Sequence, residues 1–146
     1  MRVYLDTSVF SAYYDERAPE RMQATKEFWN VLKRHDALCS TLTLDELAQA
    51  SPEFRDQLIG LASGFGIIQI SDQIRTLAQA YVESGIVPTR YVADALHIAA
   101  AVYGDADILL SWNFKHLVKR NTRLMVNSVN AQRGLRSIEI LAPPEL

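Results

Sequence analysis

The first element of the chain is predicted from Val3-Tyr4-Leu5-Asp6-Thr7-Ser8. Apolar residues that stop at an acid indicate a short buried strand over residues 2–6. The Asp-Thr-Ser that follows is typical of a helix start, because these side chains can accept a hydrogen bond from a free backbone N–H. A strand that passes directly into a helix is the first half of a strand–helix–strand unit.

The same alternation recurs along the chain. Further strands are predicted over residues 37–41, 67–70, 107–110 and 137–141. Amphipathic patterns and capping signals predict helices over 21–34, 43–50, from Ser51 to between 60 and 66, 71–84, 88–103 and 121–133. Alternating strands and helices indicate an α/β domain whose mostly parallel sheet is covered on both faces. In such sheets, ligands bind at the carboxyl ends of the strands, where the strand order reverses.

Length and composition are those of one folded domain over residues 1–146. Hydrophobic residues make up 49% of the chain and charged residues 22%, which excludes a disordered segment. The single cysteine, Cys39, excludes an internal disulfide framework and a cysteine-based zinc site. Because no apolar run resembles a signal peptide or a membrane span, we expect a cytoplasmic protein without a membrane partner.

The net charge of −2 hides an uneven distribution. Between Ser111 and Ile138 there are six basic residues and no acid, whereas the rest of the chain carries nine basic and seventeen acidic residues. The six are Lys115, Lys119, Arg120, Arg123, Arg133 and Arg136. Such a stretch is either a solvated helix face or a surface for the phosphates of a nucleic acid, and charge alone favours the first.

Two acids lie where the predicted sheet places a ligand site. Asp6 ends the first strand and is expected to point into the crevice, although capping the next helix is the commoner role of such an Asp. Glu46 falls at the start of the helix after the second strand. Taken alone, Thr43-Leu44-Asp45-Glu46 predicts a capping box in which Thr43 is the N-cap and Glu46 reaches back, and Asp45 competes for either role.

The third acid, Asp94, lies in the first or second turn of an apolar, alanine-rich helix. A carboxylate buried there is costly unless a cation, solvent or a partner such as Arg90 compensates it. His97, one turn later, is predicted to be packed or hydrogen-bonded rather than a metal ligand, because no second histidine lies nearby in the sequence. Asp105 and Asp107 precede a strand instead of ending one, so we expect them in turns at the opposite edge of the sheet.

Three carboxylates that converge on one crevice repel each other unless a divalent cation neutralises them. Oxygen ligands alone favour Mg²⁺ or Mn²⁺ over zinc. Such an ion generates hydroxide from water and stabilises an in-line displacement at phosphorus. The amide oxygen of Asn113, after the fourth strand, is a further candidate to bind the cation or position a water. The sequence holds no persuasive catalytic triad, GxSxG or P-loop, so metal-assisted hydrolysis is the chemistry it favours.

Five segments, in this order, resemble the PIN-domain family and, within it, the VapC-type toxin ribonucleases of bacterial toxin–antitoxin pairs. They are Val3-Tyr4-Leu5-Asp6-Thr7-Ser8, Thr43-Leu44-Asp45-Glu46, Asp94-Ala95-Leu96-His97-Ile98-Ala99-Ala100, Leu109-Leu110-Ser111-Trp112-Asn113 and Ile138-Glu139-Ile140-Leu141-Ala142-Pro143. The resemblance covers nearly the whole chain, and the segment that begins at Asp94 is its most specific part. It implies that the metal-binding and catalytic acids are Asp6, Glu46 and Asp94, with Asn113 beside them. The residues expected to support these acids are Thr7, Ser8 and Ser111.

The resemblance also implies a doubly wound, three-layer α/β domain with a parallel sheet of four or five strands. It implies an RNA substrate, a cognate antitoxin that blocks the site, and a homodimer. In the family the basic surface lies near the acidic crevice, which favours phosphate binding by the basic stretch. The expected phosphate contacts are Lys115, Lys119, Arg120 and Arg123. Trp112 and Phe114 are either base-stacking residues or loop anchors packed on the core.

One residue departs from the family pattern, because Asn113 stands where a fourth Asp is usual. The site therefore has one negative charge fewer, which weakens the binding of a second metal ion more than the binding of the first. Asn113 supports an alternative in which the chain keeps the fold but is an inactive RNA- or protein-binding module. The three acids argue against that alternative.

Two other classes of α/β protein fit the sequence less well. A phosphatase of the haloacid-dehalogenase class needs a second Asp where this chain has Ser8. A receiver-like domain needs paired acids at the end of the first strand, and the nearest candidates here, Asp15 and Glu16, lie too far along the chain.

Overall fold

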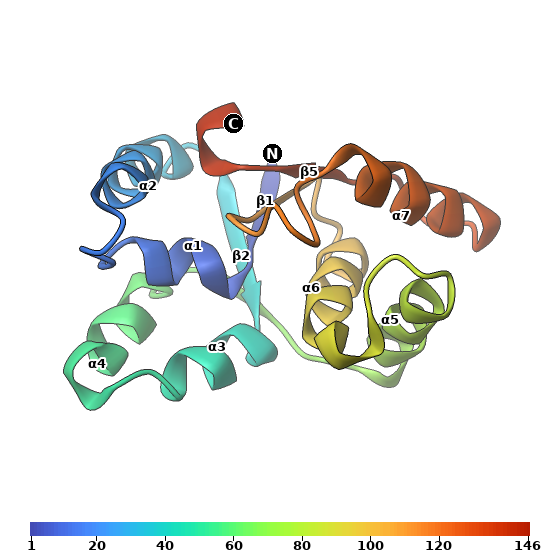
Figure 1. Ribbon diagram of the computed structural model, residues 1–146, viewed down its shortest axis with the longest axis horizontal. Coiled ribbons are helices and arrows are strands. Elements are labelled where there is room, and N and C mark those ends of the chain that lie inside the picture. The colour runs from blue at the N-terminus through green and yellow to red at the C-terminus, as the bar shows by residue number, and fades with distance from the viewer.

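The computed structural model describes residues 1–146 and is built from strands that alternate with helices (Figure 1). The strands are β1 (Arg2–Leu5), β2 (Asp36–Ser40), β3 (Gly66–Ile68), β4 (Ile108–Leu110) and β5 (Glu139–Leu141). The α-helices are α1 (Thr7–Ala12), α2 (Pro19–Leu32), α3 (Thr41–Ala48), α4 (Pro52–Leu61), α5 (Asp72–Glu83), α6 (Val92–Tyr103) and α7 (Arg120–Gln132). Two 3₁₀ turns are η1 (Thr89–Tyr91) and η2 (Pro143–Glu145). None of the helices is both long and apolar enough to cross a bilayer.

All strands pair in parallel, in the order β3-β2-β1-β4-β5. The chain first builds the sheet outward from β1 through β2 to β3, then crosses back to add β4 and β5 on the other side. The strand order therefore reverses between β1 and β4, which is where doubly wound sheets bind ligands. Leu5 lies opposite Leu110 in the register, so Asp6 and Ser111, the next residues, follow the two strands side by side.

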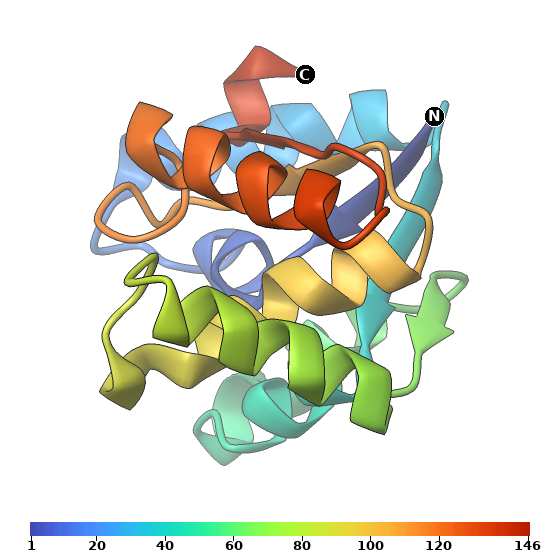
Figure 2. The same cartoon turned by 90° about the vertical axis from the view of Figure 1, so that its right-hand side faces the viewer.

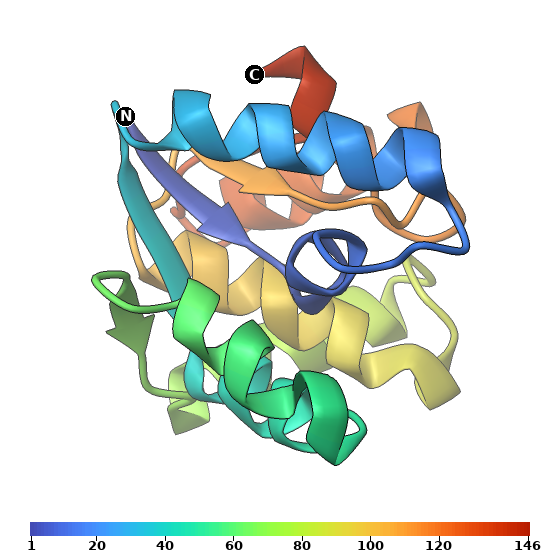
Figure 3. The same cartoon turned by 90° about the vertical axis from the view of Figure 1, so that its left-hand side faces the viewer.

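Helices cover both faces of the sheet. Figure 2 shows α5, α6 and α7 on one face, and Figure 3 shows α1, α2, α3 and α4 on the other. Side chains of β1 alternate between the two layers, since Val3 and Leu5 pack in the core beneath α1 to α4 whereas Tyr4 packs in the core beneath α5 to α7. The predicted α/β architecture, with one parallel sheet between two helical layers, is confirmed.

The predicted elements are present with ends that differ by a few residues. The helix predicted over 43–50 begins at Thr41, because Ser40 is its N-cap. Ser40 Oγ accepts from the Thr43 N–H at 3.4 Å, and Thr43 Oγ1 accepts from the Ser40 N–H at 3.2 Å. The capping box predicted between Thr43 and Glu46 is therefore wrong, and Glu46 has no capping role. The strand predicted over 67–70 is shorter, and the helix predicted over 88–103 divides into η1 and α6.

Asp105 and Asp107 lie at the amino-terminal edge of the sheet, as predicted. Asp107 accepts hydrogen bonds from the backbone N–H of Arg2 and from Nη2 of Arg136, both at 2.9 Å. Asp105 occupies the left-handed region of backbone space with a φ of 57°, as turn residues of this type do. These two acids therefore stabilise the edge opposite the crevice.

Candidate active site

Asp6 follows β1 directly and is 4% exposed. Its backbone N–H donates to the carbonyl of Leu110 in β4 at 3.1 Å, which fixes Asp6 at the reversal of strand order. Its Oδ1 accepts from the N–H and the hydroxyl of Ser8 at 3.0 and 2.5 Å, and its Oδ2 accepts from the Ser111 hydroxyl at 2.6 Å. Asp6 thus caps α1 and also lies where the strand order reverses, so its capping role is compatible with a place at this edge of the sheet.

Glu46 joins α3 to α1 and α6. Its Oε1 accepts from the Thr7 hydroxyl at 2.8 Å and from Nε2 of His97 at 2.6 Å. The neighbouring Asp45 is exposed, whereas Glu46 is only partly so. Of the two adjacent acids that competed for this role, Glu46 is therefore the one that contacts the other site elements.

Asp94 lies in the first turn of α6, opposite the loop that follows β4. Nδ2 of Asn113 donates to Asp94 Oδ2 at 3.3 Å, while Oδ1 of Asn113 accepts from the backbone N–H of His116 at 2.9 Å. The amide oxygen of Asn113, which was a candidate ligand for the cation, therefore accepts a hydrogen bond within its own loop. Arg90, the suggested partner of Asp94, lies instead 5.0 Å from the ring centre of Tyr91.

The pKa values of the three acids shift in different directions. Burial raises the pKa of Asp6, and burial followed by repulsion from Asp6 raises the pKa of Asp94. Burial also opposes ionisation of Glu46, but its hydrogen bonds with His97 and Thr7 outweigh that penalty and lower the pKa of Glu46. The charged forms of Asp6 and Asp94 would therefore be stabilised by a nearby cation.

The donor chemistry of the site suits a hard divalent cation, because the three acids offer only oxygen. Oδ1 of Asp94 and Oε2 of Glu46 accept no hydrogen bond from the protein and remain available as ligands. In this structure no three His, Cys, Asp or Glu side chains are grouped as a metal site. The two free oxygens, on Asp94 and Glu46, fit an ion that is bound through few carboxylates and keeps several water ligands, as Mg²⁺ does.

Two buried residues that the sequence did not assign to the site connect its parts. His97 is 2% exposed and contacts both Glu46 and the hydroxyl of Tyr4, so the prediction that it is hydrogen-bonded is confirmed. Tyr4 is fully buried between apolar neighbours in β1. Its one sequence signal is its place two residues before Asp6, which puts both on the same side of an extended chain.

The predicted phosphate contacts lie in the loop after β4 and on α7. Lys115, Lys119 and Arg120 are exposed. Arg123 differs, because its Nε donates to the carbonyl of Ile140 at 2.8 Å and so ties α7 to β5. Three of the four cations are therefore exposed to solvent, and the fourth has a structural contact.

The two aromatic residues of the same loop have different surroundings. Nε1 of Trp112 donates to the Thr25 hydroxyl at 3.0 Å, and the Trp112 ring packs against both cores. Arg21 lies over that ring, 5.1 Å from its centre. Phe114 is 49% exposed. Trp112 is therefore a loop anchor, and Phe114 is the aromatic side chain available for stacking.

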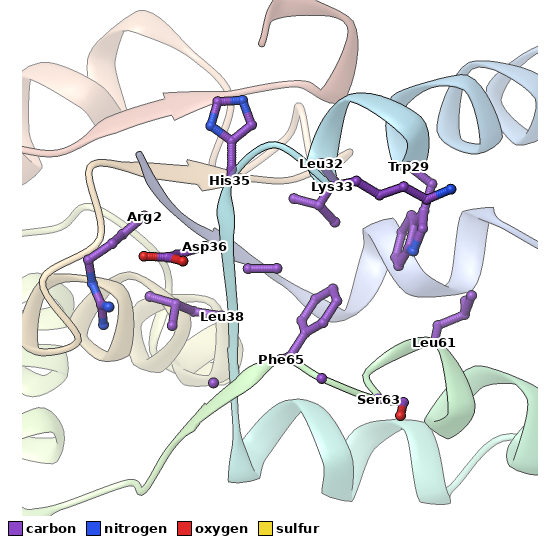
Figure 4. Close-up of a pocket in the computed structure, with 13 residues that line it drawn as sticks. Arg2, Trp29, Leu32, Lys33, His35, Asp36, Leu38, Leu61, Ser63 and Phe65 are labelled. Atoms are coloured by element: carbon purple, nitrogen blue, oxygen red, sulfur yellow. The ribbon is translucent and has the colours of Figure 1, made fainter.

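A separate cavity of about 530 Å³ opens at the amino-terminal ends of β1 and β2 (Figure 4). Trp29 and Phe65 line one side of it, and Arg2 and Asp36 lie at the other. Because all strands run in the same direction, this cavity lies at the edge of the sheet opposite Asp6. None of the three site acids lines it, so it is not part of the candidate active site.

Comparisons with known proteins agree with this fold. The family model of the PIN domain matches residues 3–115. A toxin–antitoxin complex from Klebsiella pneumoniae has a TM-score of 0.60 at 20% identity, covering 82% of this chain and 93% of the other. VapBC2 from Rickettsia felis, solved bound to a DNA fragment from its promoter, has a TM-score of 0.59 at 14% identity, with 97% and 98% covered. VapC20 of Mycobacterium tuberculosis, described as a toxin that cleaves the sarcin–ricin loop, has a TM-score of 0.58 at 12% identity, with 94% and 98% covered. No curated protein matches the sequence.

Proposed function

Because the chain belongs to the PIN-domain family, we propose that it is a divalent-metal-dependent endoribonuclease and the toxin of a toxin–antitoxin pair. The observation that carries this proposal is that Asp6 and Asp94 both accept hydrogen bonds from residues that follow β4, Ser111 and Asn113, where the strand order reverses. Burial raises both pKa values, and Asp6 adds repulsion at Asp94. Carboxylates whose charged form is disfavoured by burial and by a like charge are characteristic of catalytic sites.

Asp6, Glu46 and Asp94 are the residues that would hold Mg²⁺ or Mn²⁺, the ions that suit oxygen ligands. The bound ion would supply an activated water and neutralise charge on the scissile phosphate. The protein's own contribution is to keep the carboxylates oriented before the ion arrives. The side chains that do this by direct hydrogen bonds include Thr7, Ser8, Ser111 and Asn113.

RNA would approach the acids across the loop after β4. Lys115, Lys119 and Arg120 attract phosphates from solvent, and exposed Phe114 stacks on an unpaired base. Arg123 contributes less than the other three cations because its guanidinium is engaged with β5. Substrate binding is thus assigned to side chains that lie beside the acids in one loop and the start of one helix.

A cognate antitoxin and a second copy of this chain are the partners that we propose. Two similar structures are toxin–antitoxin assemblies by description. We assign the nuclease to a single domain over residues 1–146, with the antitoxin covering the acids to prevent cleavage.

The alternative is a binding module that keeps the fold without activity. Asn113 favours it, because its amide donates to Asp94 where the family usually has a fourth acid. The three remaining acids favour the enzyme. Metal binding separates the two functions, since a binding module does not need a cation at Asp6.

The test is a calorimetric titration of Mn²⁺ into the wild type and into Asp6→Asn, with RNA cleavage assayed on the same samples. We expect saturable binding and cleavage in the wild type and loss of both in the variant. The stoichiometry gives the number of ions bound. A well-folded wild type that neither binds Mn²⁺ nor cleaves RNA would refute the enzyme and favour the binding module.

A further inference from the structure

A continuous path of buried hydrogen bonds runs from the core to Glu46. The hydroxyl oxygen of Tyr4 lies 2.8 Å from Ser40 Oγ and 2.7 Å from Nδ1 of His97. The other ring nitrogen, Nε2, lies 2.6 Å from Glu46 Oε1. Tyr4 and Ser40 are 0% exposed and His97 is 2% exposed, so water does not substitute for these contacts.

With His97 as a neutral imidazole, the chemistry of the groups gives each of these hydrogen bonds one direction. An ionised carboxylate only accepts, so Glu46 takes the N–H of His97 Nε2. A neutral imidazole has one N–H, hence Nδ1 accepts, and the hydroxyl that faces it belongs to Tyr4. Burial raises the pKa of Tyr4, which therefore keeps its proton. The Tyr4 oxygen in turn accepts from Ser40.

We propose that His97, oriented by Tyr4, is a positioning residue that holds Glu46 in the conformation that binds the cation. This inference rests on the proposed metal-dependent function. With Oε1 held by His97 and Thr7, Oε2 is the oxygen of Glu46 left to bind the ion. The affinity of the site for its metal then depends on a histidine that does not touch the metal.

The need for such support is greatest at Glu46. Its side chain is 34% exposed and is carried by α3, a helix of eight residues. His97 lies three residues after Asp94 on α6, which places both on one helix face, and Tyr4 lies two residues before Asp6. The path through His97 therefore connects the most exposed of the three acids to the two elements that position the others.

Two substitutions separate the two hydrogen bonds of His97. His97→Gln is long enough to place an amide N–H near the position of Nε2, whereas His97→Asn reaches only the position of Nδ1. We expect His97→Asn to weaken Mn²⁺ binding, measured by calorimetry, by about 10–100-fold, and His97→Gln to recover most of that loss. RNA cleavage at a Mn²⁺ concentration that half-saturates the wild type should show a lower kcat with little change in the KM for RNA, because the proposed phosphate contacts lie elsewhere.

Tyr4→Phe tests the same path with a smaller change in shape. Its matched control is Tyr81→Phe, which removes another buried hydroxyl, the one that donates to Asn130 Oδ1 at 2.5 Å between α5 and α7. Tyr4→Phe loses two buried hydrogen bonds and Tyr81→Phe loses one, so both should melt at a lower temperature than the wild type. Only Tyr4→Phe should weaken Mn²⁺ binding, and by less than His97→Asn.

The outcomes distinguish this inference from the function on which it rests. Wild-type Mn²⁺ affinity in folded His97→Asn would overturn the positioning role, as would failure of His97→Gln to improve on it. If neither His97 variant folds, the comparison of Tyr4→Phe with Tyr81→Phe decides, and equal affinities in that pair overturn the role. A wild type without Mn²⁺ binding or cleavage would refute the proposed function and the positioning role together.

Discussion

Replacing Asp94 by Asn should abolish RNA cleavage and also stabilise the fold at neutral pH. Asn has the shape of Asp and keeps an oxygen for the hydrogen bond that Asn113 Nδ2 donates at 3.3 Å. What the variant loses is a negative charge that burial and Asp6 both disfavour. Single electrostatic groups of this kind contribute about 100-fold or more to kcat, so cleavage should fall by at least that factor.

The gain in stability has a defined dependence on pH. Because the pKa of Asp94 is raised in the folded protein, its contribution to wild-type stability is fully present below the ordinary value of 3.8 and is lost as the pH rises through the folded-state pKa. Asp94→Asn does not undergo this loss. At neutral pH we expect the variant to be more stable by on the order of 1 kcal/mol, a figure reduced for the surface that Asp94 keeps in water. For a domain of this size that is a rise in Tm of about 2–4 °C.

Melting curves followed by circular dichroism from acid to neutral pH measure this effect, and a fluorogenic RNA measures cleavage in Mg²⁺. Asp45→Asn, which removes an exposed carboxylate from α3, is the control and should change neither quantity. A difference in Tm that is the same at every pH would refute the electrostatic argument. Cleavage by Asp94→Asn at the wild-type rate would refute the assignment of the site.

Three further perturbations address other parts of the molecule. Neutralising Lys119 and Arg120 together should weaken RNA binding and reduce the slope of log affinity against log salt by about 2, read from fluorescence anisotropy, and an unchanged slope would make them a solvated face. Asn113→Asp places a second carboxylate beside Asp94, so the variant should melt at a lower temperature than the wild type at neutral pH. Added Mn²⁺ should raise the Tm of the variant more than it raises the Tm of the wild type. Equal increases in Tm would contradict the close approach of the two side chains. Burial raises the pKa of Cys39 to about 12, so alkylating reagents at mildly alkaline pH should label this thiol only after unfolding. Rapid labelling of the folded protein, detected by mass spectrometry, would show instead that the thiol is accessible.

Local patterns predicted the elements of this fold well because they depend on neighbours in sequence. The apolar run that stops at Asp6 gives both β1 and the start of α1. The capping box failed because two patterns overlap, one from Ser40 to Thr43 and one from Thr43 to Glu46, and each alone is a reasonable helix start. The end of β2 at Ser40 decides between them, and that end depends on pairing with β1 and β3.

Contacts between residues far apart in the chain could not be predicted from the sequence alone. Tyr4 and His97 are 93 positions apart, and nothing near either one indicates that they share a hydrogen bond. Tyr4 in particular looks like one more apolar residue of a buried strand. The contact of Arg123 with Ile140 is similar, since a basic helix face gives no sign of which cation is engaged with the backbone.

The central position of β1 has a consequence for the order in which the protein matures during translation. The first strand to be synthesised has both neighbours in the finished sheet, and the second of them, β4, follows most of the chain. Asp6 gains the hydroxyl that holds its Oδ2 from Ser111, 105 positions later. Parallel pairing across such separations is slow. A ribosome-bound chain that ends before Ser111 therefore lacks the ordered crevice, so any capacity to cut RNA begins late in synthesis, after most of the chain has left the ribosome.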